Sequence, residues 1–204
     1  SFIRLETADD ETTLVAADGS LVSYLRIDGS RQIIGEEEYT HLVNSSTVKL
    51  GARFDRPGHA MQIFFVRDPA RARGAVETLV RPSHNAAKNI GLDLDDLFRE
   101  RVRHMSHYLV WEECYFVLWT RPSILTKSDY GRAAKDAKNK KWVNAPNAQF
   151  PLAALDILRA RHKSYVAGIV SALDELGIRA DMLESHDALR AVRNNMFPDH
   201  TNEK

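Results

Sequence analysis

Trp111-Glu112-Glu113-Cys114-Tyr115-Phe116-Val117-Leu118-Trp119-Thr120 is the stretch of sequence that decides the fold. Aromatic and β-branched residues favour strands, and the proline at position 122 cannot continue one. The stretch carries few polar residues, so we expect it to lie in the middle of a sheet, with Phe116 and Leu118 pointing into the core.

Around this strand the sequence predicts further strands. Residues 12–17 and 20–29 are rich in strand-forming residues, and Asp18-Gly19 between them favours the type I′ turn of a hairpin. Alternation in the second arm predicts one mainly buried face. Residues 61–66 form another apolar run, and residues 178–183 predict a short strand at an edge of the sheet.

The remaining segments predict helices. Carboxylates at positions 36–38 suit the positive end of a helix dipole, Asp68-Pro69 resembles an N-cap followed by proline, and Ser185 is a further candidate cap. The predicted helices cover residues 36–50, 68–79, 83–108 with a break at Gly91, 124–139, 155–176 and 185–196. This order predicts an α+β fold: an antiparallel or mixed sheet of about four to five strands, with helices packed mainly on one face.

Length and composition are those of a folded globular domain. The 204 residues are 44% hydrophobic and 27% charged, which suits one large domain or a domain with a helical appendage. Basic and acidic residues both number 28, so no net charge draws the chain to nucleic acid or anionic lipid. Cys114 is the single cysteine, which excludes an intramolecular disulfide and a multi-cysteine zinc site. No apolar stretch approaches the roughly 20 residues of a membrane-spanning helix.

The sequence contains none of the common nucleotide-binding or catalytic motifs. It has no Gly-x-x-x-x-Gly-Lys-Ser/Thr loop, no Gly-x-Gly-x-x-Gly loop and no Gly-x-Ser-x-Gly elbow. Phosphate-binding loops need glycine because the backbone must approach the phosphate closely. We therefore expect no catalytic residue, no cofactor and no metal in this chain, and predict a domain that acts by contacting other proteins.

One segment departs from the neutral balance of charge. Residues 127–141 carry six basic and two acidic side chains, a local charge of +4. The basic residues are Lys127, Arg132, Lys135, Lys138, Lys140 and Lys141. Such a patch could dock an acidic protein surface, anionic lipid headgroups or nucleic-acid phosphates. A solvated helix face explains the same pattern, and the sequence does not decide between the two.

Two rival hypotheses concern other classes of protein. A small metal-dependent enzyme would use His104 and His107, which lie three residues apart on a predicted helix, with Glu112, Glu113 or Cys114 as a third ligand. Polar packing at a helix surface explains the histidine pair more simply, and metal analysis would separate the two. A nucleic-acid-binding module is the second rival, and a salt-dependent affinity would reveal it.

A turn is predicted where residues 36–50 give way to residues 61–66. In Phe54-Asp55-Arg56-Pro57-Gly58-His59 the proline fixes φ and the glycine can adopt a positive φ. Asp55, Pro57 and Gly58 are therefore expected to be structural rather than catalytic.

Three stretches resemble a known family. Residues 18–23, Asp28-Gly29 and residues 54–62 resemble the N-terminal domain of the CagE/TrbE/VirB family of type IV secretion and conjugation ATPases, most closely its Dot/Icm-type members. The order of elements along most of the chain agrees with the resemblance, while the recognisable stretches all lie before residue 63. None of them is catalytic.

The resemblance implies a role. Residues 1–197 would form an N-terminal assembly and docking domain, and residues 198–204 would begin the linker to an ATPase domain that holds ATP and magnesium. The implied partners are secretion-system subunits and further copies of the parent protein, with peripheral contact to the inner membrane. The implied location is cytoplasmic, at the cytoplasmic face of the bacterial inner membrane. The neutral charge argues against a nucleic-acid partner.

Overall fold

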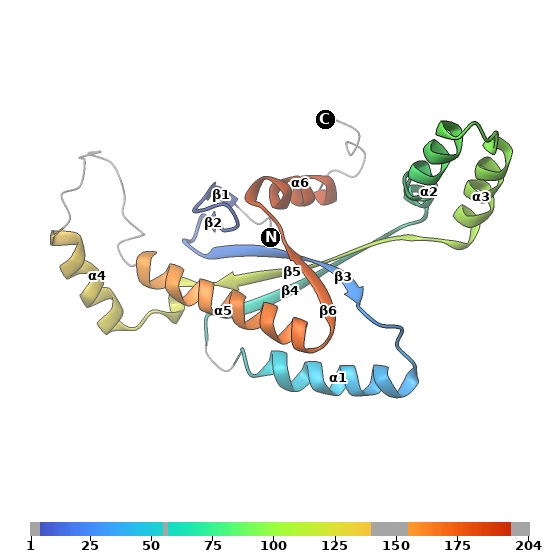
Figure 1. Ribbon diagram of the computed structural model, residues 1–204. Coiled ribbons are helices and arrows are strands. Elements are labelled where there is room, and N and C mark those ends of the chain that lie inside the picture. The colour runs from blue at the N-terminus through green and yellow to red at the C-terminus, as the bar shows by residue number, and fades with distance from the viewer. Residues whose placement is uncertain (1–4, 55–56, 140–154, 197–204) are drawn as a thin grey trace. The chain divides into compact units, whose positions relative to one another are not determined.

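The computed structural model describes residues 5–54, 57–139 and 155–196 and has the predicted α+β fold (Figure 1). The strands are β1 (Leu5–Ala8), β2 (Leu14–Ala16), β3 (Leu21–Ser30), β4 (His59–Asp68), β5 (Trp111–Thr120) and β6 (Ile178–Met182). The helices are α1 (Glu36–Gly51), α2 (Ala72–Asn89), α3 (Asp95–Tyr108), α4 (Lys127–Asn139), α5 (Leu155–Glu175) and α6 (Ser185–Met196), with 3₁₀ turns at Pro69–Arg71 and Pro122–Ile124. The predicted linker, residues 198–204, lies outside the described residues.

The strands form one antiparallel sheet in the order β1-β2-β3-β5-β4, with β6 paired to β3. It has six strands where the sequence predicts about four to five, because β1, which the sequence does not predict, also joins it. β5 lies between β3 and β4, which confirms the central position predicted for residues 111–120. β6 runs antiparallel to β3, with Met182 opposite Leu25.

Helices pack on the sheet as predicted, α5 on one face and α6 on the other. Side chains alternate along a strand, so neighbours in β3 and β5 belong to different core layers. On one face Val22, Tyr24, Tyr115 and Val117 pack with Ala188 of α6. On the other face Leu25, Phe116 and Leu118 pack with Tyr165, Ile169 and Leu173 of α5. The first half of β3 is consequently buried on both faces, not on one as predicted.

The turn between β2 and β3 differs from the predicted type I′ turn. The backbone N–H of Gly19 donates to the carbonyl of Ala16 at 2.8 Å. Gly19 has a φ of +78°, while no non-glycine residue among those described has a positive φ. A type I′ turn needs positive φ at both central residues, so Asp18 excludes it. The side chain of Asp18 instead accepts from the N–H of Ser20 at 2.9 Å.

Of three predicted helix signals, the break between residues 79 and 83 and the cap at Ser185 differ in the structure, while the cap at Asp68 is present. The segments predicted as separate helices before and after residue 82 form one helix, α2, with Pro82 inside it. Asp68 caps the 3₁₀ turn as expected, accepting from the N–H of Ala70 at 2.9 Å. Ser185 starts α6, but its hydroxyl donates to the carbonyl of Asp10 at 2.8 Å instead of capping the helix.

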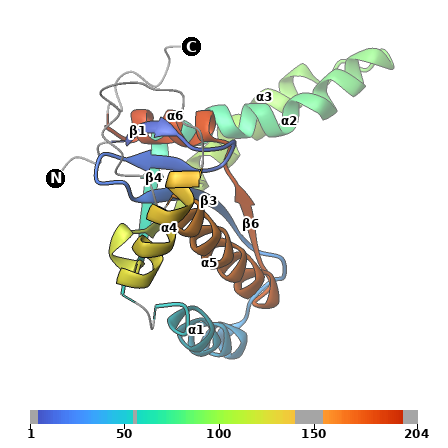
Figure 2. The ribbon, with the colours of Figure 1, turned by 90° about the vertical axis from the view of Figure 1, so that its left-hand side faces the viewer.

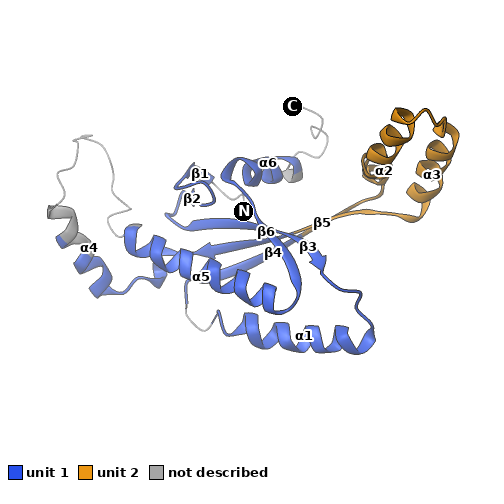
Figure 3. Cartoon of the chain, in the orientation of Figure 1, with its two compact units in different colours: residues 1–64, 115–204 blue, residues 65–114 orange. Residues whose placement is uncertain are grey.

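The chain divides into two compact units (Figure 3). The first comprises residues 1–64 and 115–204, and the second comprises residues 65–114. In the second unit α2 and α3 form a helical hairpin that buries Val76, Phe98 and Val102. No helix within the described ranges is both long enough and apolar enough to cross a membrane.

Candidate functional site

The basic helix α4 begins with a reciprocal pair of hydrogen bonds. The carboxylate of Asp129 accepts from the backbone N–H of Thr126 at 2.9 Å and from its hydroxyl at 2.8 Å. The N–H of Asp129 donates back to the hydroxyl of Thr126 at 3.3 Å. This arrangement is a capping box, which satisfies backbone donors that a helix start leaves unpaired.

Asp129 also fixes α4 to the long helix α5. Its side chain is 3% exposed and pairs with Arg161 of α5 at 2.8 Å and with Arg132 of α4 at 3.1 Å. The backbone N–H and the hydroxyl of Thr126, together with the two arginines, hold the pKa of Asp129 below its usual value. The carboxylate therefore stays ionised at neutral pH. α5 also packs on α1, so α5 contacts both α4 and α1 (Figure 2).

The predicted basic residues occupy different environments. Lys127 and Lys135 are exposed on α4. Arg132 is also exposed, but its guanidinium is engaged by Asp129. Lys138 belongs to the last part of α4, whereas Lys140 and Lys141 lie outside the described residues. Lys127 and Lys135 are thus exposed cations on one helix, the start of which is fixed by Asp129.

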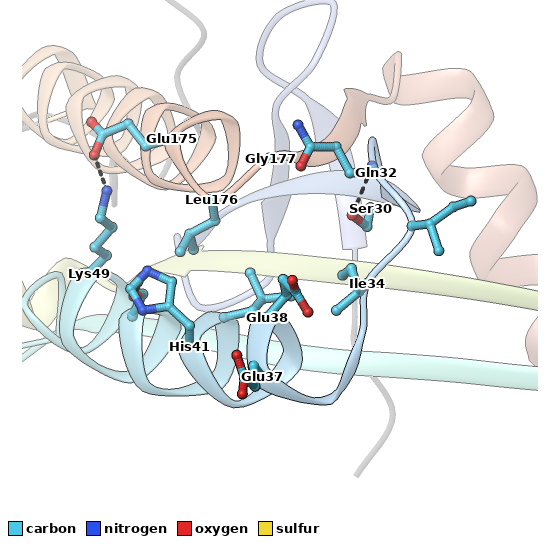
Figure 4. Close-up of a pocket in the computed structure, with 13 residues that line it drawn as sticks. Ser30, Gln32, Ile34, Glu37, Glu38, His41, Lys49, Glu175, Leu176 and Gly177 are labelled. Carbon is cyan, nitrogen blue, oxygen red and sulfur yellow. Dashed lines mark hydrogen bonds and ion pairs between the residues drawn. The ribbon is translucent and has the colours of Figure 1, made fainter.

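A second candidate is an acidic cleft between α1 and the turn from α5 to β6 (Figure 4). It has a volume of about 470 Å³. Its polar lining includes Glu37, Glu38 and His41 from α1, and Lys49 of α1 reaches Glu175 of α5 at 2.5 Å. The bond to Lys49 lowers the pKa of Glu175. The cleft suits a cationic or polar group rather than an anion.

The structure describes the histidines of the rival metal hypothesis. His104 and His107 are both exposed on α3, and the ring of His104 lies 5.1 Å from that of Tyr108. Glu113 is engaged by Trp111 at 3.0 Å and by Arg71 at 3.2 Å. Over the described ranges, no three His, Cys, Asp or Glu side chains are grouped so that they could hold a metal ion. Burial raises the pKa of Cys114, which disfavours its reactive thiolate.

Pro57 and Gly58 form the turn that leads into β4. Gly58 has a φ of +109°, and its carbonyl accepts from the N–H of Arg121 at 2.8 Å. A Cβ at this position would lie 2.7 Å from the Cβ of Ile124. Both its conformation and the space around it therefore require glycine. Asp55, the third predicted turn residue, lies outside the described residues.

A buried polar network around His162 was not predicted. His162 of α5 is 1% exposed, and its two ring nitrogens each lie 2.9 Å from a hydroxyl, Nε2 from Ser23 and Nδ1 from Thr120. Ser23 already donates its proton to the carbonyl of Thr12 at 2.9 Å. Ser23 must then accept from Nε2–H of His162, and Thr120 must donate to Nδ1. Every member is satisfied and buried, so we interpret the network as structural.

Sequence signals existed for part of these sites. The spacing Thr126-x-x-Asp129 is a capping-box pattern and could have located the start of α4. His162 lies four residues after Leu158 and four before Val166, so helical spacing places it on the buried stripe of α5. Nothing local in the sequence pairs Arg161 with Asp129.

The fold and these sites define an α+β domain with an inserted helical hairpin and an anchored basic helix. No protein-family model and no curated protein sequence matches the chain.

Proposed function

We propose that this chain is a non-catalytic assembly and docking domain of a type IV secretion system ATPase, which energises substrate export at the inner membrane. We infer that the parent is a Dot/Icm-type member of the CagE/TrbE/VirB family, because the chain resembles the ATPase DotO. The sequence resemblance in residues 18–23, 28–29 and 54–62 supports the family, and ATP hydrolysis belongs to the remainder of the parent protein.

The anchored basic helix is the observation that carries the docking role. A helix that only contacts solvent needs no buried ion pair. In α4, by contrast, Asp129 is held in place by Arg161 and by the cap that Thr126 forms. Fixing the start of α4 lowers the conformational cost of presenting its cations to a partner. Lys127 and Lys135 then offer positive charge at defined positions. The partner surface is acidic and belongs to a subunit of the secretion channel.

Charge reversal in the full-length parent protein tests this function. Replacing Lys135, Lys138, Lys140 and Lys141 with glutamate changes the local charge from +4 to −4. Each surface change should alter stability by less than about 0.5 kcal/mol, so the fold survives. Association with the acidic subunit should weaken, and more so at low salt, because the Debye length exceeds about 10 Å below 0.1 M. Co-purification of the secretion complex measures assembly, and circular dichroism checks folding.

Two controls separate a positioned patch from general attraction. Lys127→Glu with Lys135→Glu should impair assembly, whereas the same change at the exposed Arg101 and Arg103 of α3 should not. Asp129→Asn makes α4 more positive but loosens its anchor, so docking should weaken although the charge rises. Wild-type assembly by the well-folded quadruple variant would leave α4 as a solvated face and contradict the proposal.

A further inference from the structure

Strand β4 lies at the end of the sheet order and has only β5 as a described neighbour. It is ten residues long, and neither proline nor glycine interrupts it. Its central residues 61–66 carry no charge. Ile63 and Phe65 are two apart, so both point to the same face of the strand, and they are 60% and 56% exposed.

Among the described strands, the other two edges of the sheet are protected by devices that the central part of β4, residues 61–66, lacks. β1 has four residues, with an irregular register between Leu5 and Thr7. β6 has five residues and carries Arg179, 3.5 Å from Asp28, and Asp181, 2.9 Å from Arg26. Short length, irregularity and charge are the usual means by which proteins prevent edge pairing. A ten-residue edge whose central six residues carry no charge, with Arg67 and Asp68 confined to its end, and which exposes apolar side chains is instead a pairing site.

We propose that the outer edge of β4 pairs antiparallel with β4 of a second copy of this chain. The inference rests on the proposed function, because it names the surface through which the domain would self-associate. A two-fold axis perpendicular to the sheet keeps equivalent faces on the same side. Odd-numbered residues of one copy therefore stand opposite odd-numbered residues of the other.

The side chains of β4 favour one register of this pairing. With Phe64 opposite Phe64 of the second copy, Ile63 stands opposite Phe65 in both directions. Aromatic and β-branched residues are favourable cross-strand partners. The same register sets Arg67 against Met61 and Asp68 against Ala60, so no like charges face one another. A strand of self-complementary pattern suits a second copy better than an unrelated peptide.

Sedimentation of the whole 204-residue chain over a range of concentrations tests the pairing. The wild-type chain should form a dimer. Ile63→Lys with Phe65→Lys should raise the dimer dissociation constant at least about tenfold, because lysines would then stand opposite lysines. The fold should persist, since both side chains are already exposed, and circular dichroism checks this. The matched control replaces Leu79 and Leu97 of the helical hairpin with lysine. These side chains are 68% and 57% exposed, and the change should leave the dimer unchanged.

Cysteine cross-linking tests the register. In a Cys114→Ser background, Gln62→Cys with Val66→Cys should form an intermolecular disulfide, because residues 62 and 66 of two copies stand opposite each other. Opposed Cα atoms lie about 4.5–5.5 Å apart, within the range that a disulfide spans. Gln62→Cys alone should not cross-link. A chain that stays monomeric, or a dimer that is insensitive to the lysine variant, would overturn the pairing. These variants leave α4 intact, so that result would not bear on docking by the basic helix.

Discussion

Gly58 illustrates how a single residue sets the path of the chain into the sheet. Its carbonyl bonds to the N–H of Arg121 and its φ is +109°. Two atoms of Ile124, Cβ at 2.7 Å and the backbone nitrogen at 2.9 Å, occupy the space that a side chain would need. Backbone atoms cannot give way cheaply, so the start of β4 depends on the absence of a Cβ.

Gly58→Val should therefore destabilise the protein, by about 2–4 kcal/mol from backbone strain and overpacking together. Gly74→Ala is the matched control, because Gly74 lies within α2 with nothing within 4 Å of its would-be Cβ. That change should stabilise the chain by about 0.4–1 kcal/mol. Chemical denaturation of both variants measures the difference. Equal stability of the two variants would show that the turn tolerates a side chain.

His162 is a second single residue with a large effect, because it makes the stability of the fold depend on pH. Burial lowers the pKa of its imidazole from the usual 6.5 to about 4, because the charged form is poorly solvated there. Between these two pH values the unfolded chain binds a proton that the folded chain does not. The contribution of neutral His162 is thus complete above pH 6.5 and is lost as the pH falls towards 4.

We expect the free energy of unfolding to decrease on acidification through this window, by about 3 kcal/mol from His162 alone. Urea denaturation at several pH values measures the slope. In His162→Gln, where no imidazole can be protonated, the slope between pH 6.5 and 4 should be smaller. An unchanged slope in that variant would assign the acid sensitivity to other groups.

At the scale of elements, the sequence predicted those with strong local signals. Residues 111–120 and 155–176 have unmistakable apolar patterns, and β5 and α5 follow them closely. β1 was missed because its four residues carry no such pattern and acquire their conformation from pairing with β2. The sequence predicts separate helices over residues 68–79 and 83–108, whereas α2 continues through the gap between them, with Pro82 inside it. These differences arise from tertiary contacts, which a local pattern does not contain.

The two core residues predicted on β5, Phe116 and Leu118, should contribute differently to the free energy of unfolding. Leu118 is completely buried against α5, whereas Phe116 is half-buried at the border of the same cluster. Leu118→Ala should cost about 2–5 kcal/mol. Phe116→Ala should cost less than Leu118→Ala, although it removes a larger side chain, because part of that side chain already contacts water. Thermal or urea unfolding of the two variants decides, and the reverse order would contradict this core assignment.

At the scale of the whole molecule, the sequence predicted more of the fold than of the candidate site, because the site depends on contacts between residues that are far apart in the chain. The count of lysines between residues 127 and 141 was visible in the sequence, but the ion pair from Asp129 to Arg161 joins residues 32 positions apart. Likewise, the exposed edge of β4 follows from the strand order and not from residues 61–66 themselves. Long-range pairing decides which charges are engaged and which edges stay open.

A triphosphate is usually bound where a glycine-rich loop meets a helix N-terminus, because backbone N–H groups and the helix dipole both attract the phosphates. In this chain several helices begin with carboxylates, Glu36 to Glu38 in α1 and Asp95 and Asp96 in α3, which repel phosphate at that end. Gly19, Gly58 and Gly177, three of its positive-φ glycines, lie in turns.

We therefore expect no micromolar binding of ATP to this chain and no hydrolysis, with or without magnesium. Isothermal titration calorimetry of the isolated chain measures binding, and release of phosphate measures hydrolysis. The proposed function predicts that a full-length parent protein with an ATPase domain gives a signal under the same conditions, so that protein is the positive control. Saturable micromolar binding by the isolated chain, abolished by substitutions within residues 1–204, would place nucleotide recognition inside this domain and contradict its assignment as a purely docking module.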